Sequence, residues 1–267
     1  MISNTIITEN LNSLTDAQID YELNKPQLTI LYQDEYLVAI DKPPGLFVHR
    51  SFMDKDEIYF ALQLVRDLVG QYVYPLHRLD RPTSGVLLFA LTKNVAQKMG
   101  EAFSLNDSNK NIQKTYYALT RGHLLGVNLI DYPLKEKLDK LGDKNVSRDK
   151  PAQAAQTYYQ SIKTVSLPIA IGKYDSVRYS LIRLLPQTGR RHQLRRHLAH
   201  LRHPIIGDIN YGDNKQNPFF IEHFGFKRLM LIAKELSFIH PIYNKKITIS
   251  APFDEQWQQV LNLSSWN

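Results

Sequence analysis

The apolar and polar positions of this chain follow two periods, and the pattern typical of strands is the commoner one. Short runs in which apolar residues alternate with polar ones, or form an unbroken block, predict β-strands. The expected strands are residues 27–32, 36–41, 86–90, 114–120, 157–165, 177–185, 228–233 and 247–250. Apolar residues at helical spacing predict helices at 56–69, which Gly70 should end, and at 94–103. Because no regular strand–helix–strand repeat is present, we expect an α+β fold with a mixed, mainly antiparallel sheet and flanking helices.

The first 26 residues differ from the rest of the chain. They are polar and show no sustained period, although Leu11, Leu14 and Ile19 could form a short helix. No linker rich in proline, glycine or serine divides the remaining residues. We therefore expect an N-terminal extension at 1–26 followed by a single domain at 27–267, since one domain can exceed two hundred residues.

Composition narrows the class of protein. At 267 residues and 43% hydrophobic content, the chain can bury a sizeable core. Its net charge of +7 suits a partner that carries phosphates. The absence of cysteine excludes disulfides, thiolate zinc sites and cysteine nucleophiles. No apolar run is long enough to span a bilayer and the N-terminus lacks a secretory pattern, so we expect a cytoplasmic protein without a membrane segment.

The segment 77–85 holds the first candidate for chemistry. It places Asp80 between Arg78 and Arg81, then supplies the turn-forming residues 82–85 ahead of an apolar strand. A carboxylate held between cations stays ionised and can act as a nucleophile. Asp80 could equally cap the turn and pair with an arginine at the surface. The local pattern leaves both interpretations open.

The second candidate is the basic segment 190–203, which contains five arginines and four histidines. Leucines at 194, 198 and 201 recur at helical spacing, so the segment should form an amphipathic helix with a dense positive face. That face could bind phosphate or could simply be solvated. His197, His200 and His203 are also candidate zinc ligands, but their positions drift around a helix and no acidic residue lies nearby, so we expect no metal.

Four segments in a fixed order give the chain a resemblance to a known family. The segments are residues 41–49, 77–85, 114–118 and 188–197, the last running on to 204–208. Together they resemble the pseudouridine synthases that modify ribosomal and transfer RNA, and the likeness covers residues 27–262. The resemblance implies a catalytic domain at 27–267 with a mixed sheet, flanking helices and a central cleft, acting on RNA without a cofactor or metal.

The resemblance also implies roles for single residues. Asp80 corresponds to the family's catalytic aspartate, Arg195 to the arginine that pairs with it, and Tyr116 to the active-site tyrosine. Arg190 is a second candidate for that pairing. Arg78 resembles the residue that enters the RNA stack in place of the extruded uridine.

The segment 228–233 resembles the strand that closes over the uracil base. Leu229 or Leu231 is expected to pack on the base. Ile232 stands where the family commonly has a histidine, a departure that affects a hydrogen bond from this position and not the reaction. Tyr117 should face the opposite side of the sheet from Tyr116 and is the weaker candidate of the two.

The motifs are most similar to family members that isomerise a tRNA uridine, conventionally numbered 65, where the T stem meets the acceptor stem. We therefore expect tRNA as the partner of a monomeric enzyme. Residues 1–26 are too few for the small RNA-binding domain that some members carry, so the catalytic domain itself should contact RNA. The alternatives are a ribosomal RNA substrate, a non-catalytic RNA-binding module and a zinc-dependent hydrolase. Attack by Asp80 at the ribose C1′ or at the base C6, and proton removal from the ribose, all remain open.

Overall fold

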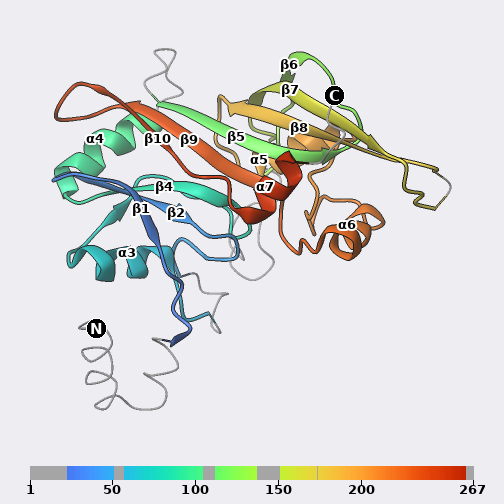
Figure 1. Ribbon diagram of the computed structural model, residues 1–267. Coiled ribbons are helices and arrows are strands. Elements are labelled where there is room, and N and C mark those ends of the chain that lie inside the picture. Colours follow the sequence, from blue (N-terminus) through green and yellow to red (C-terminus); the bar gives the residue numbers. More distant parts are fainter. Residues whose placement is uncertain (1–22, 51–56, 105–111, 137–150, 173, 263–267) are drawn as a thin grey trace.

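A computed structural model describes residues 23–50, 57–104, 112–136, 151–172 and 174–262. In that part of the chain, ten strands form one sheet whose main path runs β1-β2-β4-β9-β5-β8-β7-β6 (Figure 1). These strands are β1 (Thr29–Gln33), β2 (Leu37–Lys42), β4 (Ser84–Ala90), β9 (Leu231–Ile239), β5 (Ile112–Arg121), β8 (Val177–Pro186), β7 (Gln156–Leu167) and β6 (Val127–Asp131). Two further strands lie off this path: β3 (Tyr74–Pro75) pairs with β4, and β10 (Lys246–Ser250) pairs with β9.

Most of the strand pairs are antiparallel, and β4 runs parallel to β9. The helices are α3 (Ala61–Val69), α4 (Lys93–Ser104), α5 (Gln193–His200), α6 (Gln216–Phe224) and α7 (Glu255–Leu261). Figure 1 shows α3 beneath the β1–β2 part of the sheet and α6 beneath its other end. The α+β class with a mixed, mainly antiparallel sheet is therefore confirmed. No described helix is long and apolar enough to cross a membrane.

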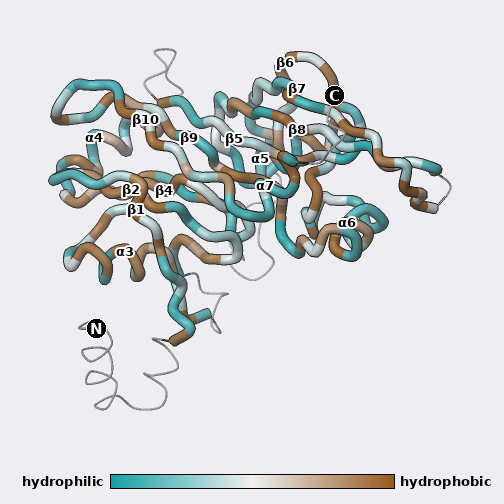
Figure 2. The backbone as a smooth tube through the Cα atoms, in the orientation of Figure 1, coloured by the Kyte–Doolittle hydropathy of each residue, from teal (hydrophilic) through white to brown (hydrophobic). Residues whose placement is uncertain are grey.

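Helices cover both faces of the sheet at β2 and β4. Val38 and Ile40 of β2 belong to one hydrophobic cluster, together with Leu64 of α3. Leu37 belongs to a second cluster, together with Met99 of α4. Because neighbouring residues of a strand point to opposite faces, this division shows that β2 is buried on both sides, and hydrophobic residues accordingly run along β4 and α3 in Figure 2.

The helix expected at 56–69 is shorter in the structure, which places its first residue at Ala61. The backbone around Phe60 pairs instead with the chain near Phe47, because the N–H of Ala61 donates to the Phe47 carbonyl at 2.8 Å. Gly70 ends the helix as expected, in the left-handed conformation with φ 69°. The helix expected near residues 11–19 lies outside the described residues.

The strand expected at 228–233 is displaced along the chain: β9 begins at Leu231 and continues to Ile239. Lys234 and Glu235 lie in the middle of β9, so the apolar run that suggested a strand ends before the strand does. Pairing decides the outcome, because β9 lies among β4, β5 and β10, and this tertiary context outweighs the local pattern. Four elements were not anticipated from the sequence: β3, β6, α6 and α7.

The turn before β4 positions the candidate carboxylate. The N–H of Thr83 donates to the carbonyl of Asp80 at 3.0 Å, which closes the expected turn. Gly85 follows with φ 108°, and a Cβ at this position would lie 2.2 Å from the Ala233 carbonyl oxygen. Only glycine permits β4 to approach β9 this closely. The approach fixes Asp80 at the entrance of a central strand.

Candidate active site

A cavity of about 670 Å³ lies where the turn before β4 meets β5 and the start of α5. It is lined by Leu76, His77, Arg78, Leu79, Asp80, Thr83, Phe103, Lys114, Tyr116, Glu136, Pro186, residues 188–195 and Leu231. Three segments that are distant in sequence therefore meet at one site, and Asp80, Tyr116 and Arg195 all face the same cavity.

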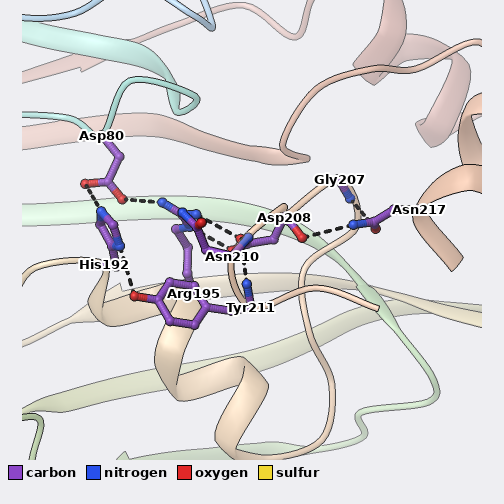
Figure 3. Close-up of polar contacts among 8 residues, drawn as sticks. All are labelled: Asp80, His192, Arg195, Gly207, Asp208, Asn210, Tyr211 and Asn217. Atoms are coloured by element: carbon purple, nitrogen blue, oxygen red, sulfur yellow. Dashed lines mark hydrogen bonds and ion pairs between the residues drawn. The ribbon is translucent and has the colours of Figure 1, made fainter. Parts of the chain in front are cut away.

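Asp80 is held by a buried arginine. Nη1 of Arg195 donates to Oδ2 of Asp80 at 3.3 Å, and the Arg195 side chain is only 3% exposed (Figure 3). The Asp80 side chain keeps 21% exposure, so its carboxylate remains open to the cavity. The expected pairing of these two residues is thus present in the structure. A carboxylate with one cationic anchor and one open side suits a group that must react with a ligand.

Arg195 is in turn fixed by Asp208, which the sequence had not singled out as a site residue. Arg195 donates from Nε to Asp208 Oδ2 at 2.7 Å and from Nη2 to Oδ1 at 2.8 Å. Oδ1 also accepts the backbone N–H groups of Asn210 and Tyr211. Burial alone would raise the pKa of Asp208, but the hydrogen bonds and charge of Arg195 hold it below its usual range. Asp208 therefore stays ionised and sets the direction of the guanidinium.

The loop around Asp208 is itself cross-linked by one side chain. Asn217 accepts the backbone N–H of Gly207 at 2.9 Å and donates to the backbone carbonyl of Asp208 at 2.9 Å (Figure 3). Asn217 belongs to α6, so this helix supports the loop that carries Asp208. The chain of contacts from α6 to Asp80 explains how an element outside the cavity contributes to its geometry.

His192 forms a second contact to Asp80. Its Nε2 lies 3.9 Å from Asp80 Oδ1, and its Nδ1 lies 3.0 Å from the hydroxyl of Tyr211 (Figure 3). Burial lowers the pKa of His192; the charge of Asp80 opposes this shift and that of Arg195 adds to it. The ring is therefore neutral near pH 7, and it neighbours Asp80 without adding a second positive charge.

The backbone at His192 explains why α5 is shorter than the basic segment. His192 has φ 54°, a left-handed conformation that is costly for a residue with a Cβ. Gln193 Oε1 accepts the hydroxyl of Thr188 at 2.7 Å and the N–H of Arg190 at 2.9 Å, so the preceding loop is bound to the first residue of the helix. These bonds hold the strained residue in place and direct its ring toward Asp80.

Tyr116 lies in β5, opposite Leu184 of β8. Burial raises the pKa of its hydroxyl, and the charge of Asp80 raises it further. The phenol is therefore protonated at neutral pH, and it lines the same cavity as Asp80. Tyr117 points to the other face of the sheet, where its ring makes an edge contact with Phe253 at 5.7 Å, as expected.

His77, to which the sequence assigned no role, lines the cavity. Its Nε2 accepts the backbone N–H of Leu88 at 3.2 Å, and its ring stacks on Phe103 at 5.3 Å. Burial lowers the pKa of His77 to about 3, and the charge of Lys114 contributes to the shift. His77 thus forms, with the ring of Phe103, an uncharged part of the cavity wall. Its position directly before Arg78 in the motif was the only signal in the sequence.

Lys42 supports the Asp80 turn and is fully buried. Its ammonium donates to the carbonyls of Pro43, Leu46 and Arg81 at 2.9, 2.8 and 3.1 Å. Burial lowers the pKa of Lys42 to about 7, although the charge of Asp80 opposes this shift. The contact with Arg81 ties the residue after Asp80 to β2. In the sequence, Lys42 belongs to the segment 41–49 that carries the family resemblance, and no role was assigned to it.

Of the four residues expected to bind substrate, three line the cavity and one does not. Arg78, Arg190 and Leu231 line the cavity. Arg78 is exposed, whereas Arg190 is held by a hydrogen bond from its Nε to the carbonyl of Ala154 at 3.1 Å. Leu229 is buried in the core and is not among the lining residues, whereas Leu231, the first residue of β9, lines the cavity.

The three histidines considered as zinc ligands have separate protein partners. His197 contacts the Thr157 hydroxyl and the Tyr132 carbonyl, both at 3.0 Å. His200 stacks on the ring of Tyr132, whereas Nδ1 of His203 contacts the Arg121 carbonyl. Across the described residues, no group of three or more histidine and acidic side chains is placed to hold a metal ion. These histidines act as structural contacts of α5 and of the residues that follow it.

Comparison with known proteins agrees with this geometry. The family model for RNA pseudouridylate synthases matches residues 36–200. The chain is 52% identical over 239 residues to tRNA pseudouridine synthase C of Vibrio cholerae, a match that covers 90% of this chain and 96% of that protein. The equivalent protein of Pasteurella multocida is 52% identical over 240 residues, with 90% and 97% covered.

A solved structure is similar in fold. Human RNA Pseudouridylate Synthase Domain Containing 1 superposes with a TM-score of 0.64 at 23% identity, covering 85% of this chain and 83% of that one. Asp80, Tyr116 and Arg195 all fall within the region that the family model matches. The chain therefore belongs to the RNA pseudouridylate synthase family.

Proposed function

We propose that this protein isomerises a uridine of tRNA to pseudouridine, with Asp80 as the reacting carboxylate. The observation that carries the proposal is the buried Asp208–Arg195 pair, which holds Asp80 with one side open to a cavity. Relatives that are 52% identical over almost their full length are named tRNA pseudouridine synthase C. A module that merely bound RNA would have no need of this arrangement.

The reaction conserves atoms and electrons. The bond between N1 of uracil and C1′ of ribose breaks, the base turns, C5 joins C1′, and the proton lost from C5 is balanced by one gained at N1. No oxidant or reductant is consumed, so the reaction needs no redox cofactor, and we propose that no metal takes part either. Asp80 reacts in each of the three routes: by attack at C1′, by attack at C6, or by removing a proton from the ribose.

Tyr116 is proposed to relay the C5 proton. Its raised pKa keeps the hydroxyl protonated, so it can donate its own proton as it accepts another, and it does not act as a free phenolate. Asp80 shares the cavity and is the natural partner for this relay. Leu231 forms the apolar wall that packs on the base, in preference to Leu229.

The uridine must leave the RNA helix to reach the cavity, and extrusion costs a few kcal/mol of stacking. Arg78 is exposed beside Asp80, so its planar guanidinium is placed to fill the vacated position and offset part of that cost. Arg190 lines the same cavity and is proposed to contact the substrate backbone. The target we propose is the uridine conventionally numbered 65, acted on by a monomer in the cytoplasm.

The test is to incubate wild type, Asp80→Asn and Asp67→Asn with unmodified tRNA transcripts and to map pseudouridine by carbodiimide labelling and primer extension. Asp67 is a matched control, because it pairs with Arg66 at the surface, outside the cavity. We expect product at one T-stem uridine with wild type and Asp67→Asn, and none with Asp80→Asn despite unchanged tRNA binding. Ribosomal RNA transcripts are assayed in parallel: product on ribosomal RNA and none on tRNA would contradict the tRNA assignment, and turnover by Asp80→Asn would contradict the role of Asp80.

A further inference from the structure

A second large cavity, of about 720 Å³, shares no lining residue with the catalytic cavity. It lies at the end of β5, the start of β8 and the first residues of α6. Figure 1 shows α6 at the end of the sheet away from β1 and β2. Four of the lining side chains are permanent cations: Arg121, Arg178, Arg202 and Lys215. We call these four residues and the space between them the basic groove.

The basic groove carries a net positive charge, because four cations face one carboxylate in its lining. Asp213 is the acidic residue in its lining, and it is already bound by Arg121 at 2.7 Å and by backbone N–H groups. Arg178, Arg202 and Lys215 are exposed and make no ion pair with any described residue. Like charges that converge around a concave surface raise the local concentration of anions.

The backbone at Arg202 adds independent evidence. Arg202 follows the end of α5 and has φ 65°, the left-handed conformation that usually closes a helix with glycine. A residue with a Cβ is strained there, and glycine would adopt the same conformation without strain. Arg202 thus keeps a long cationic side chain in the lining of the basic groove at a backbone position that favours glycine.

The basic groove continues toward the catalytic cavity. A smaller cavity of about 340 Å³ shares Arg121, Arg202 and Asp213 with it and extends to Tyr211. The hydroxyl of Tyr211 contacts His192, which lines the catalytic cavity beside Asp80 (Figure 3). The smaller cavity and the catalytic cavity are therefore neighbours across the Tyr211–His192 contact, so one RNA chain can lie along both.

We propose that the basic groove binds the sugar-phosphate backbone of the substrate RNA, at a site separate from the one that receives the extruded uridine. The identity of that RNA as tRNA rests on the proposed function. Phosphates fit this site because they are spaced along a polymer, carry permanent charge and need no base-specific contacts. The groove anchors the RNA body while Arg78 and Asp80 act on one nucleotide.

The test compares tRNA binding by wild type, Arg202→Gly, the triple variant Arg178→Gln/Arg202→Gly/Lys215→Gln, and Lys246→Gln. Lys246 is an exposed lysine of β10, outside the groove, and serves as the charge control. Dissociation constants of an unmodified transcript are measured by fluorescence anisotropy over a range of salt concentrations. Arg202→Gly is informative because relief of backbone strain should leave its Tm unchanged or higher while binding weakens.

Log affinity falls as log salt concentration rises, and we expect the triple variant to make this slope shallower by about 2 to 3, close to one per lost phosphate contact. Its KM for tRNA should rise while kcat at saturating tRNA stays at the wild-type value. Wild-type affinity and slope in the triple variant would overturn the inference, and so would an equal loss in Lys246→Gln. A wild type that binds tRNA but forms no pseudouridine would contradict the proposed function alone, since the binding data decide the groove separately.

Discussion

Asp208 binds Arg195 through two parallel hydrogen bonds, and neither side chain is exposed by more than 3%. A planar guanidinium that is held on one edge has a fixed direction for its remaining N–H groups. Here they point to Asp80 at 3.3 Å. The reacting carboxylate is thus oriented by a second carboxylate that never touches the cavity, since Asp208 is not among the lining residues.

Asp208→Asn should be costly for both stability and turnover. The substitution leaves the buried Arg195 without its charge partner, and breaking a buried pair costs about 3–5 kcal/mol. Asp67→Asn removes an exposed pair with Arg66 and should cost no more than about 1 kcal/mol. Urea unfolding gives both values, and kcat is measured well below the Tm of each variant. Equal effects of the two substitutions would show that the buried Asp208–Arg195 pair contributes no more to stability and turnover than an exposed pair.

Tyr116→Phe should keep the fold and lose the chemistry. The ring retains its packing in β5, whereas the hydroxyl proposed to relay the C5 proton is removed. Proton transfer by one positioned group contributes about 10²–10⁴-fold, so kcat should fall within that range while KM for tRNA is unchanged.

The control for this change is Tyr117→Phe, on the opposite face against Phe253. It should retain wild-type kcat. The raised pKa keeps Tyr116 protonated at pH 8 to 10. The pH dependence of kcat in that range should therefore have the same shape for wild type and for Tyr116→Phe. A change of wild-type kcat between pH 8 and 10 that is absent in Tyr116→Phe would mean that the phenolate is the active form.

The contrast between Asp80 and Asp208 shows how far the sequence predicts this site. Asp80, Tyr116 and Arg195 stand in compact motifs, and the structure brings them to one cavity. Asp208 lies in a matching segment too, but its role depends on a contact with Arg195 across a loop, and no local spacing encodes that contact. Likewise, the strained φ of His192 depends on Gln193 and the loop that Gln193 holds.

The fold shows the same limit. Alternating and apolar runs predicted the strands of a mainly antiparallel sheet, because burial on a sheet face leaves a local pattern. The limits of β9 and of α3 were wrong, since pairing with distant strands and with the Phe47 segment decided them. The parallel contact of β4 and β9 also left no periodic signal, although Gly85 marks the point of closest approach.

Gly85→Ala should therefore destabilise the protein strongly. The new Cβ would lie 2.2 Å from the backbone oxygen of Ala233, and φ 108° is unfavourable for alanine. Because backbone cannot yield as a flexible side chain does, we expect a loss of about 3 kcal/mol or more in the free energy of unfolding.

Gly100→Ala provides the matched control for that substitution. Gly100 lies inside α4, and a Cβ added there would have nothing within 4 Å, so alanine should add about 0.5–1 kcal/mol to the free energy of unfolding. Urea unfolding of the two variants should give shifts of opposite sign. A stable Gly85→Ala protein with wild-type unfolding would show that β4 and β9 are farther apart than the 2.2 Å contact requires.

Lys42 should give stability a distinctive pH dependence. Burial lowers its pKa from 10.5 to about 7 in the folded protein, whereas the unfolded chain keeps the ordinary value. Between these two values the unfolded state binds more protons, so the free energy of unfolding must rise with pH, by up to about 1.4 kcal/mol per pH unit. Below pH 7 the protonated lysine imposes its full burial cost.

Lys42→Met has no titrating group and should lose this contribution, although the three carbonyls of Pro43, Leu46 and Arg81 lose their donor. Urea unfolding of both proteins at pH 7, 8, 9 and 10 should therefore show a steeper rise for wild type. Parallel curves would mean that Lys42 titrates as it does in water, and that the Asp80 turn is not held by a buried, easily deprotonated amine.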